Sequence, residues 1–162
     1  MILHPDIAYK IVDMTTLQSR LHHWRAVGGT VVFTNGCFDI LHPGHVELLA
    51  QCRNLGDHVV LGLNSDASVR RLKGTDRPVN DQLSRAVVLA GLSFVDAIIV
   101  FEEDTPLELI TQVKPDILVK GGDYQASEIV GSELVKNYGG EVKIIPLVEG
   151  FSTTAIIGRM DS

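Results

Sequence analysis

The sequence predicts an α/β fold, a Rossmann-like three-layer α/β/α arrangement built on a five-stranded parallel sheet. Short apolar runs rich in β-branched residues alternate five times with segments of helical periodicity. This alternation is typical of parallel strands joined by right-handed crossovers. The apolar runs also lack a polar/apolar alternation, as expected for strands that are covered on both faces. A chain of 162 residues suits one domain with its own core.

The amino-terminal part of the chain predicts one helix. Residues 1–14 have no clear pattern and are expected to be irregular. Thr15 and Gln18 have the spacing of a capping box ahead of apolar residues at helical intervals. A glycine pair that begins at Gly28 should end this helix. The expected division of the chain is residues 1–29 as an N-terminal helical extension and residues 30–162 as the α/β domain.

The later elements follow from periodicity, caps and helix breakers. Thr105 is expected to cap a helix that has Pro106 in its first turn. The expected strands are 30–35, 58–64, 96–101, 116–120 and 141–146. The expected helices are 15–26, 42–55, 65–72, 81–92, 105–114, 127–138 and a last one from residue 152.

Composition and charge exclude some classes of function. The formal net charge of −6 argues against a nucleic-acid surface, which is usually basic. It permits a small anionic ligand, because a local cationic pocket can form in an acidic protein.

Cys37 and Cys52 form no CxxC pair, which predicts reduced thiols and a cytoplasmic location. The first ten residues do not resemble a signal peptide, and no apolar run approaches the roughly 18 residues of a membrane span. We therefore expect no membrane partner.

Polar segments follow four of the five expected strands. They cover residues 35–45, 64–77, 120–124 and 149–154. The carboxyl ends of parallel strands meet at one edge of a sheet, and ligands of such folds bind there. The sequence therefore predicts a single site that is formed by these segments.

His42 and His45 lie where the first strand gives way to a helix. A helix N-terminus has unpaired N–H groups and binds anions. Gly44 lets a phosphate approach the backbone, and two histidines three positions apart occupy neighbouring positions on a helix. Ordinary core or surface histidines are one alternative. A zinc site is another, although HxxxH spacing and a third ligand would suit zinc better. The pattern favours a nucleotide phosphate site.

The segment GCFDILHPGH, residues 36–45, resembles the GxFDxxHxGH signature of nucleotidyltransferases that include the glycerol-phosphate and ethanolamine-phosphate cytidylyltransferases. The segments at residues 79–110, 115–124 and 149–157 resemble the heptose 1-phosphate adenylyltransferases of lipopolysaccharide precursor synthesis. The similarity runs from about Val31 to Ile157.

This resemblance implies a reaction in which D-glycero-D-manno-heptose 1-phosphate attacks the α-phosphorus of ATP. Pyrophosphate leaves, and the product is ADP-heptose. Because the attacking oxygen is already ionised, catalysis requires alignment and charge neutralisation. The resemblance also implies Mg²⁺ and a homodimer. The bifunctional members have a kinase domain ahead of the transferase, and this chain has no room for one, so a separate sugar kinase is expected upstream.

Three alternatives remain open at this stage. One is a cytidylyltransferase for glycerol phosphate or a similar alcohol phosphate. Another is a flavin- or coenzyme-type adenylyltransferase, and the third is a nucleotide-binding module without catalysis. Cytidylyltransferases of the group typically have an arginine ahead of EGxSTT, whereas this chain has residues 146–149, PLVE. That difference favours ATP over CTP.

Several candidate residues have more than one interpretation. Lys73 is suited to bridge the α-phosphate and the sugar phosphate, or belongs to a solvated basic loop. Asp39 orders the histidine loop or contacts a sugar hydroxyl. Cys37 is a catalytic thiol or a small buried apolar residue, and the sequence does not rank the arginines at positions 70, 71 and 77.

The candidate catalytic residues are His42, His45 and Lys73. The candidate nucleotide-binding residues are Thr34, Asn35, Cys37, Phe38, His42, Pro43, Gly44, His45, Lys120, Gly121, Asp123, Ser152, Thr153 and Thr154. The candidate substrate-binding residues are Asp39, Asn64, Arg71 and Arg77, and no metal ligand is assigned.

Overall fold

A computed structural model describes residues 2–122, 124–146, 148, 150–151 and 153–160. Five parallel strands form one sheet in the order β3-β2-β1-β4-β5. The chain order reverses between β1 and β4, which makes their carboxyl ends the switch point of the sheet. The predicted five-stranded parallel α/β fold is confirmed. The strands are β1 Val31–Gly36, β2 His58–Asn64, β3 Ala97–Phe101, β4 Ile117–Gly121 and β5 Glu141–Ile145.

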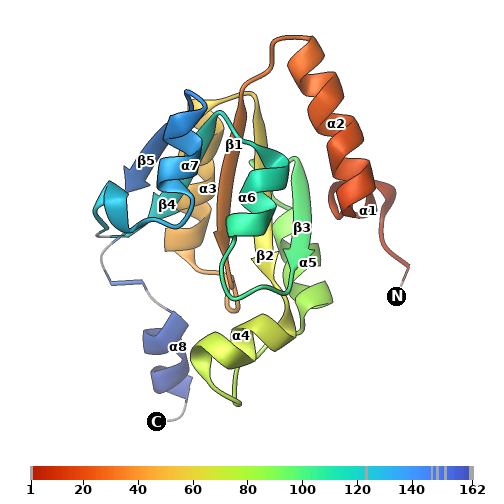
Figure 1. Cartoon of the computed structure of the whole chain (residues 1–162). Coiled ribbons are helices and arrows are strands. Elements are labelled where there is room, and N and C mark those ends of the chain that lie inside the picture. The colour runs from red at the N-terminus through yellow and green to blue at the C-terminus, as the bar shows by residue number, and fades with distance from the viewer. Residues whose placement is uncertain (1, 123, 147, 149, 152, 161–162) are drawn as a thin grey trace.

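Helices cover both faces of the sheet (Figure 1). On one face, α2, α6 and α7 pack against the strands through a core that includes Leu17, Phe33 and Leu118. On the other face, Leu49 of α3 and Leu89 of α5 belong to a second cluster, and Cys52 of α3 belongs to a third. The helices are α1 Pro5–Lys10, α2 Met14–Ala26, α3 Pro43–Leu55, α4 Asp66–Lys73, α5 Gln82–Ala90, α6 Leu107–Val113, α7 Ser132–Asn137 and α8 Thr153–Met160, with a 3₁₀ turn η1 at Ala126–Glu128.

The amino-terminal segment is more ordered than its sequence predicted. Residues expected to be irregular contain α1, which has Pro5 in its first turn and the His4 ring as its cap. Helix α2 begins at Met14 and is capped by Asp13, whose carboxylate accepts a hydrogen bond from the Thr16 amide, so the predicted cap at Thr15 is wrong. A carboxylate two positions earlier already satisfies the free amides of this helix. Both helices pack on the sheet, and Ile11 pairs with Ile98.

Two other predicted helices have different boundaries. The expected helix 127–138 divides into η1 and α7, because Gly131 between them has a φ of +85°. Helix α6 begins at Leu107, and Pro106 is its cap residue without a side-chain hydrogen bond, so the predicted cap at Thr105 is wrong. Helix α4 extends one residue further than expected and includes Lys73.

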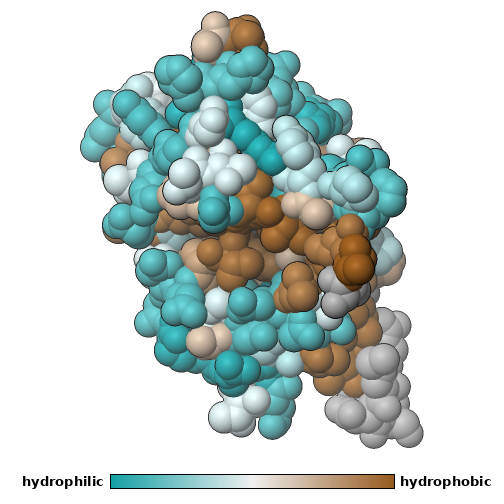
Figure 2. Space-filling view, turned by 90° about the vertical axis from the view of Figure 1, so that its right-hand side faces the viewer, coloured by the Kyte–Doolittle hydropathy of each residue, from teal (hydrophilic) through white to brown (hydrophobic). Residues whose placement is uncertain are grey.

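The surface beside β3, one of the two edge strands, has a hollow away from the switch point. A groove of about 480 Å³ lies between residues 12–14, the end of β3 and α6. Its lining combines apolar side chains with acidic ones and includes no predicted site residue. Figure 2 shows a band of apolar surface across the side of the molecule that faces the viewer in that picture. No helix among the described residues is long and apolar enough to cross a bilayer.

Candidate active site

A cleft of about 440 Å³ opens at the carboxyl edge of the sheet. The ends of β1 and β4, the first turn of α3, the end of α4 and the start of α8 all contribute to it. The structure therefore brings together residues from each of the four polar segments. The predicted residues that line the cleft are Asn35, Cys37, Phe38, Asp39, His42, Gly44, His45, Lys73, Arg77, Lys120, Gly121 and Thr153.

The two histidines form a stacked pair at the start of α3. Their ring centroids are 3.7 Å apart and the rings are inclined by 19°. The Phe38 ring lies 4.9 Å from that of His45. Gly44 allows this arrangement, because a Cβ at that position would come within 3.1 Å of the His42 ring. The Nδ1 atoms of both histidines are buried and have no hydrogen-bond partner among the described residues. Such atoms are costly to leave unpaired, so they indicate a site for a polar ligand.

Burial favours the neutral form of both rings. Burial, with a smaller contribution from the neighbouring His42, lowers the pKa of His45 to about 4, although a hydrogen bond with the Ile40 backbone opposes the shift. Burial also lowers the pKa of His42. At neutral pH each ring therefore has one N–H donor and one acceptor nitrogen. A bound phosphate would raise both pKa values, because an opposite charge favours the protonated form.

This burial makes the stability of the free protein depend on pH. Unfolding restores the His45 pKa from about 4 to its ordinary value of 6.5. The unfolded chain therefore binds more protons between these two values, and stability should fall as the pH is lowered through that window. We expect His45 to contribute a loss of roughly 2 kcal/mol between pH 7 and pH 5. Urea unfolding at both pH values would measure it, and a His45→Gln variant with an equal loss would contradict the assignment.

The loop between β1 and α3 has an unusual backbone conformation. Phe38 has a φ of +46°, which non-glycine residues rarely adopt. Its ring packs in the core cluster of α5 and lies close to Gly36, where a Cβ would be 3.0 Å away. Strained backbone of this kind persists where the surroundings enforce it, often at functional sites. Here it supports the aromatic contact with His45.

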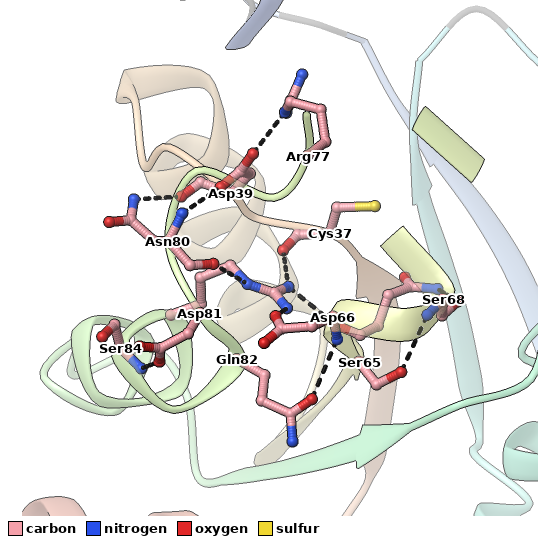
Figure 3. A network of polar contacts seen from close by, with 12 residues as sticks. Cys37, Asp39, Ser65, Asp66, Ser68, Arg77, Asn80, Asp81, Gln82 and Ser84 are labelled. Carbon is pink, nitrogen blue, oxygen red and sulfur yellow. Dashed lines mark hydrogen bonds and ion pairs between the residues drawn. The ribbon is translucent and has the colours of Figure 1, made fainter. Parts of the chain in front are cut away.

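Asp39 holds the loop after α4 against the histidine loop (Figure 3). Its buried carboxylate accepts hydrogen bonds from the amides of Val79 and Asn80 and from Arg77 Nε at 2.6 Å. Burial alone would raise the pKa of Asp39, but these hydrogen bonds outweigh it and hold the pKa below its ordinary value. The contacts favour the ordering role over a contact with a sugar hydroxyl, since both oxygens are occupied.

Cationic side chains gather around Cys37. Lys73 and Lys120 line the cleft, and both are close enough to Cys37 to interact with it electrostatically. Burial lowers the pKa of Lys120, and Lys73 adds to this effect. Burial raises the pKa of the Cys37 thiol although Lys73 opposes it, which favours a packing role over that of a nucleophile. The cleft is therefore locally cationic in a protein of net charge −6, as expected for an anion site.

Some predicted residues lie elsewhere. Arg71 does not line the cleft and instead pairs with Asp104 at 2.7 Å, because it lies two positions along α4 from Lys73 and faces another direction. Asn64 is buried and donates to Ser68 Oγ at 3.0 Å. Thr34 is buried, and its hydroxyl has no partner among the described residues. Pro43 is in the first turn of α3. Asp123, Ser152 and the Thr154 side chain are outside the described part of the chain.

Arg85 does not line the cleft but supports the segments that form it, and sequence reasoning missed it. Its guanidinium is fully buried and donates to the carbonyls of Cys37, Asn64 and Asn80 at 2.6, 2.9 and 3.0 Å. It also pairs with Asp66 at 2.8 Å. Arg85 thus joins the ends of β1 and β2 to the loop before α5. The sequence does contain a signal that could have identified Arg85, because it is a single arginine beside apolar residues on one face of a helix. Tyr124 and Phe151 also line the cleft. Both lie in the predicted polar segments 120–124 and 149–154, but neither was among the candidate site residues.

Comparison with known proteins identifies the class. Residues 33–159 match the model of the family described as cytidylyltransferase-like. The chain therefore belongs to the cytidylyltransferase-like family, and the predicted nucleotidyltransferase class is confirmed.

Among curated proteins, the chain is similar to the bifunctional protein HldE. It is 55% identical over 149 residues to that of Bradyrhizobium diazoefficiens, which covers 92% of this chain and 30% of the relative. For Campylobacter concisus the identity is 64% over 130 residues, with 80% and 27% covered. For Syntrophotalea carbinolica it is 59% over 151 residues, with 93% and 31% covered. The chain thus spans about 30% of the length of these relatives.

Solved structures support the same fold. The lipopolysaccharide core biosynthesis protein from Thermoplasma volcanium is 33% identical, with a TM-score of 0.60 over 75% of this chain and 98% of that one. A pantoate-beta-alanine ligase from Francisella tularensis, 15% identical, has a TM-score of 0.60 over 91% of this chain and 75% of that one, and this likeness concerns the fold alone.

Proposed function

We propose that this chain transfers the adenylyl group of ATP to a sugar 1-phosphate, D-glycero-D-manno-heptose 1-phosphate, and releases pyrophosphate. The product would be ADP-heptose for lipopolysaccharide core synthesis. The observation that carries this proposal is the stacked pair of His42 and His45, with buried and unpartnered Nδ1 atoms, in a cleft that also contains Lys73 and Lys120. Similarity to HldE and to a lipopolysaccharide core biosynthesis protein supports the choice of substrate.

The reaction needs little covalent chemistry from the protein. An oxygen of the sugar phosphate forms a bond to the α-phosphorus, and the bond to the bridging oxygen breaks with its electron pair going to pyrophosphate. The attacking oxygen is ionised at neutral pH, so no general base is required. The N-terminus of α3 and the two imidazoles would donate hydrogen bonds to the phosphates. Lys73 and Lys120 would neutralise charge where the two substrates meet.

Magnesium would enter with the nucleotide. The described residues contain no cluster of three or more histidine, cysteine or acidic side chains that could hold a metal ion. Asp39 is the only carboxylate among the described residues that line the cleft, and it already accepts three hydrogen-bond donors. Mg²⁺ commonly binds substrate phosphates with few protein ligands. We therefore propose Mg²⁺ bound to the triphosphate and derive no step from it.

We also propose three features of the cellular context. A sugar kinase would act upstream to supply the 1-phosphate, and the reaction would take place in the cytoplasm. The chain would form a homodimer, which the apolar band in Figure 2 supports, because large apolar patches often mark interfaces between proteins.

A pyrophosphate-release assay tests the proposed reaction. ATP, CTP, GTP and UTP would each be combined with heptose 1-phosphate, mannose 1-phosphate and glycerol 3-phosphate. We expect ATP with heptose 1-phosphate to give the highest kcat/KM, at least tenfold above CTP, since the segment ahead of α8 lacks the arginine of the cytidylyltransferases.

Two other outcomes would contradict the proposal. Preference for CTP with glycerol 3-phosphate would favour a cytidylyltransferase. Tight ATP binding with no pyrophosphate release from any acceptor would favour a non-catalytic nucleotide-binding module.

A further inference from the structure

The groove beside β3 lies where the outer edge of the sheet loses its partner. Strand β3 is the edge strand nearest α2 (Figure 1). Ile11 pairs with Ile98 near the start of β3, and the Val12 amide donates to the Ile98 carbonyl at 2.9 Å. The chain then turns away into α2, which begins at Met14. We call the hollow beyond this point the edge groove, and it is lined by residues 12–14, residues 99–103, Glu108, Leu109 and Gln112.

The open edge of β3 presents backbone groups without a partner to the edge groove. Successive residues of a strand direct their N–H and C=O groups to opposite sides. The Ile98 carbonyl faces Val12, whereas the Phe101 carbonyl faces β2 and accepts a hydrogen bond from the Ser65 amide at 2.8 Å. Val100 therefore directs its N–H and C=O groups outward, and no described residue on that side bonds to them. Such groups are a template for pairing with another extended segment.

The floor of the edge groove is apolar. Ile99, Phe101 and Leu109 are buried members of the core beneath α2 and α6, and Val12 and Met14 pack against the same core. An extended segment that paired with Val100 would direct every second side chain toward this floor. The floor therefore favours a segment that has an apolar residue at every second position.

The rim of the edge groove is acidic, and its lining includes no basic residue. Asp13, Glu102, Glu103 and Glu108 are exposed, and none of them forms an ion pair with another described residue. Three of these carboxylates accept a hydrogen bond from an N–H group close by in the chain, which leaves their charge uncompensated. Four uncompensated charges of one sign attract lysine and arginine side chains.

We propose that the edge groove binds an extended, basic segment of a partner protein, which adds a strand to the sheet beside β3. The outward backbone groups of Val100 suit a strand, the floor suits alternate apolar residues, and the rim suits lysine or arginine between them. Strand addition of this kind is a recurring mode of peptide recognition. The inference does not depend on the proposed function, because no residue of the edge groove lines the cleft.

Peptide binding to the full chain tests the charge of the partner. The probe is a seven-residue peptide that alternates lysine with valine, and its counterpart alternates glutamate with valine. By fluorescence anisotropy at low salt, we expect a Kd below about 100 µM for the lysine peptide and binding at least about tenfold weaker for the glutamate peptide. Equal binding of the two peptides would overturn the proposal. Absence of binding would also overturn it, and the acidic rim would then serve only to protect the edge from aggregation.

A pair of double variants locates the binding site. Glu102→Gln combined with Glu108→Gln removes one charge from each side of the edge groove and should weaken binding of the lysine peptide about tenfold. Glu133→Gln combined with Glu141→Gln is the matched control, because it removes two exposed charges on α7 and β5. We expect the control to bind as the wild type does. Equal binding by the two double variants would overturn the proposal.

Amide hydrogen exchange distinguishes strand addition from attraction by charge alone. The lysine peptide should slow exchange of the Val100 amide about tenfold or more, because this N–H becomes hydrogen-bonded. The Ile99 amide faces β2 and should change little. A bound peptide that leaves the Val100 amide unprotected would overturn strand addition.

Size-exclusion chromatography tests a second copy of the chain as the occupant of the edge groove. We expect the wild type and both double variants to elute at the same apparent mass. A lower mass for the Glu102→Gln, Glu108→Gln variant alone would show that the edge groove contacts a second copy, and it would overturn the proposal of a basic partner.

Discussion

We expect His45→Ala to fold and to lose turnover by about 10²–10³-fold, the usual effect of removing one preorganised donor from a reacting centre. His42→Ala should lose at least tenfold. The reason is the geometry of the pair, in which stacked rings 3.7 Å apart present buried, unpartnered nitrogens at the start of α3. The Nδ1 atoms have no hydrogen-bond partner among the described residues, so loss of the rings should affect charge stabilisation more than folding. Pyrophosphate release and thermal unfolding would measure the two effects.

The matched control for these variants is His58→Ala. His58 is also stacked, with its ring centroid 4.2 Å from that of Trp24, but it begins β2 at the amino edge of the sheet. We expect this variant to lose stability and keep its turnover. A folded His45→Ala variant with near-normal activity would show that the imidazole pair does not act on the phosphates.

Much of the fold could be predicted because its signals are local. The strands are continuous apolar runs, and β2 matches its predicted bounds of 58–64. Convergence of the polar segments also followed from topology, since parallel strands place their carboxyl ends at one edge. His42, His45, Lys73 and Lys120 come from three such segments and line one cleft. Their chemical roles remain predictions.

Other features depended on contacts that a sequence does not show. Arg71 and Lys73 are equivalent as basic residues, yet Arg71 pairs with Asp104, which is 33 positions away in the chain. Helix α1 is short, and Ile7 and Ile11 stabilise it through packing on the sheet. The edge groove is formed by segments that are distant in the chain, and none of its apolar residues has a motif.

The second large effect is expected from substitution of Arg85, which helps to position the groups that would act on the phosphates. Its three carbonyl acceptors and Asp66 require the fork of donors that a guanidinium has and an ammonium lacks. Arg85→Lys keeps the charge and leaves some of these buried acceptors unpaired, each at a cost of about 1–3 kcal/mol. We therefore expect a folded variant with a lower free energy of urea unfolding.

Turnover should also fall, because the carbonyl of Cys37 precedes Phe38, whose left-handed backbone and ring support His45. We expect kcat to fall at least tenfold while the KM for the sugar phosphate changes little, since Arg85 does not line the cleft. Arg53→Lys is the matched control, because Arg53 bonds the Asp57 carbonyl and pairs with Asp96 at the amino edge. It should lose stability and keep kcat. If both variants lost stability and kept their kcat, Arg85 would have only a structural role. The loop at Phe38 would then hold His45 in place without Arg85.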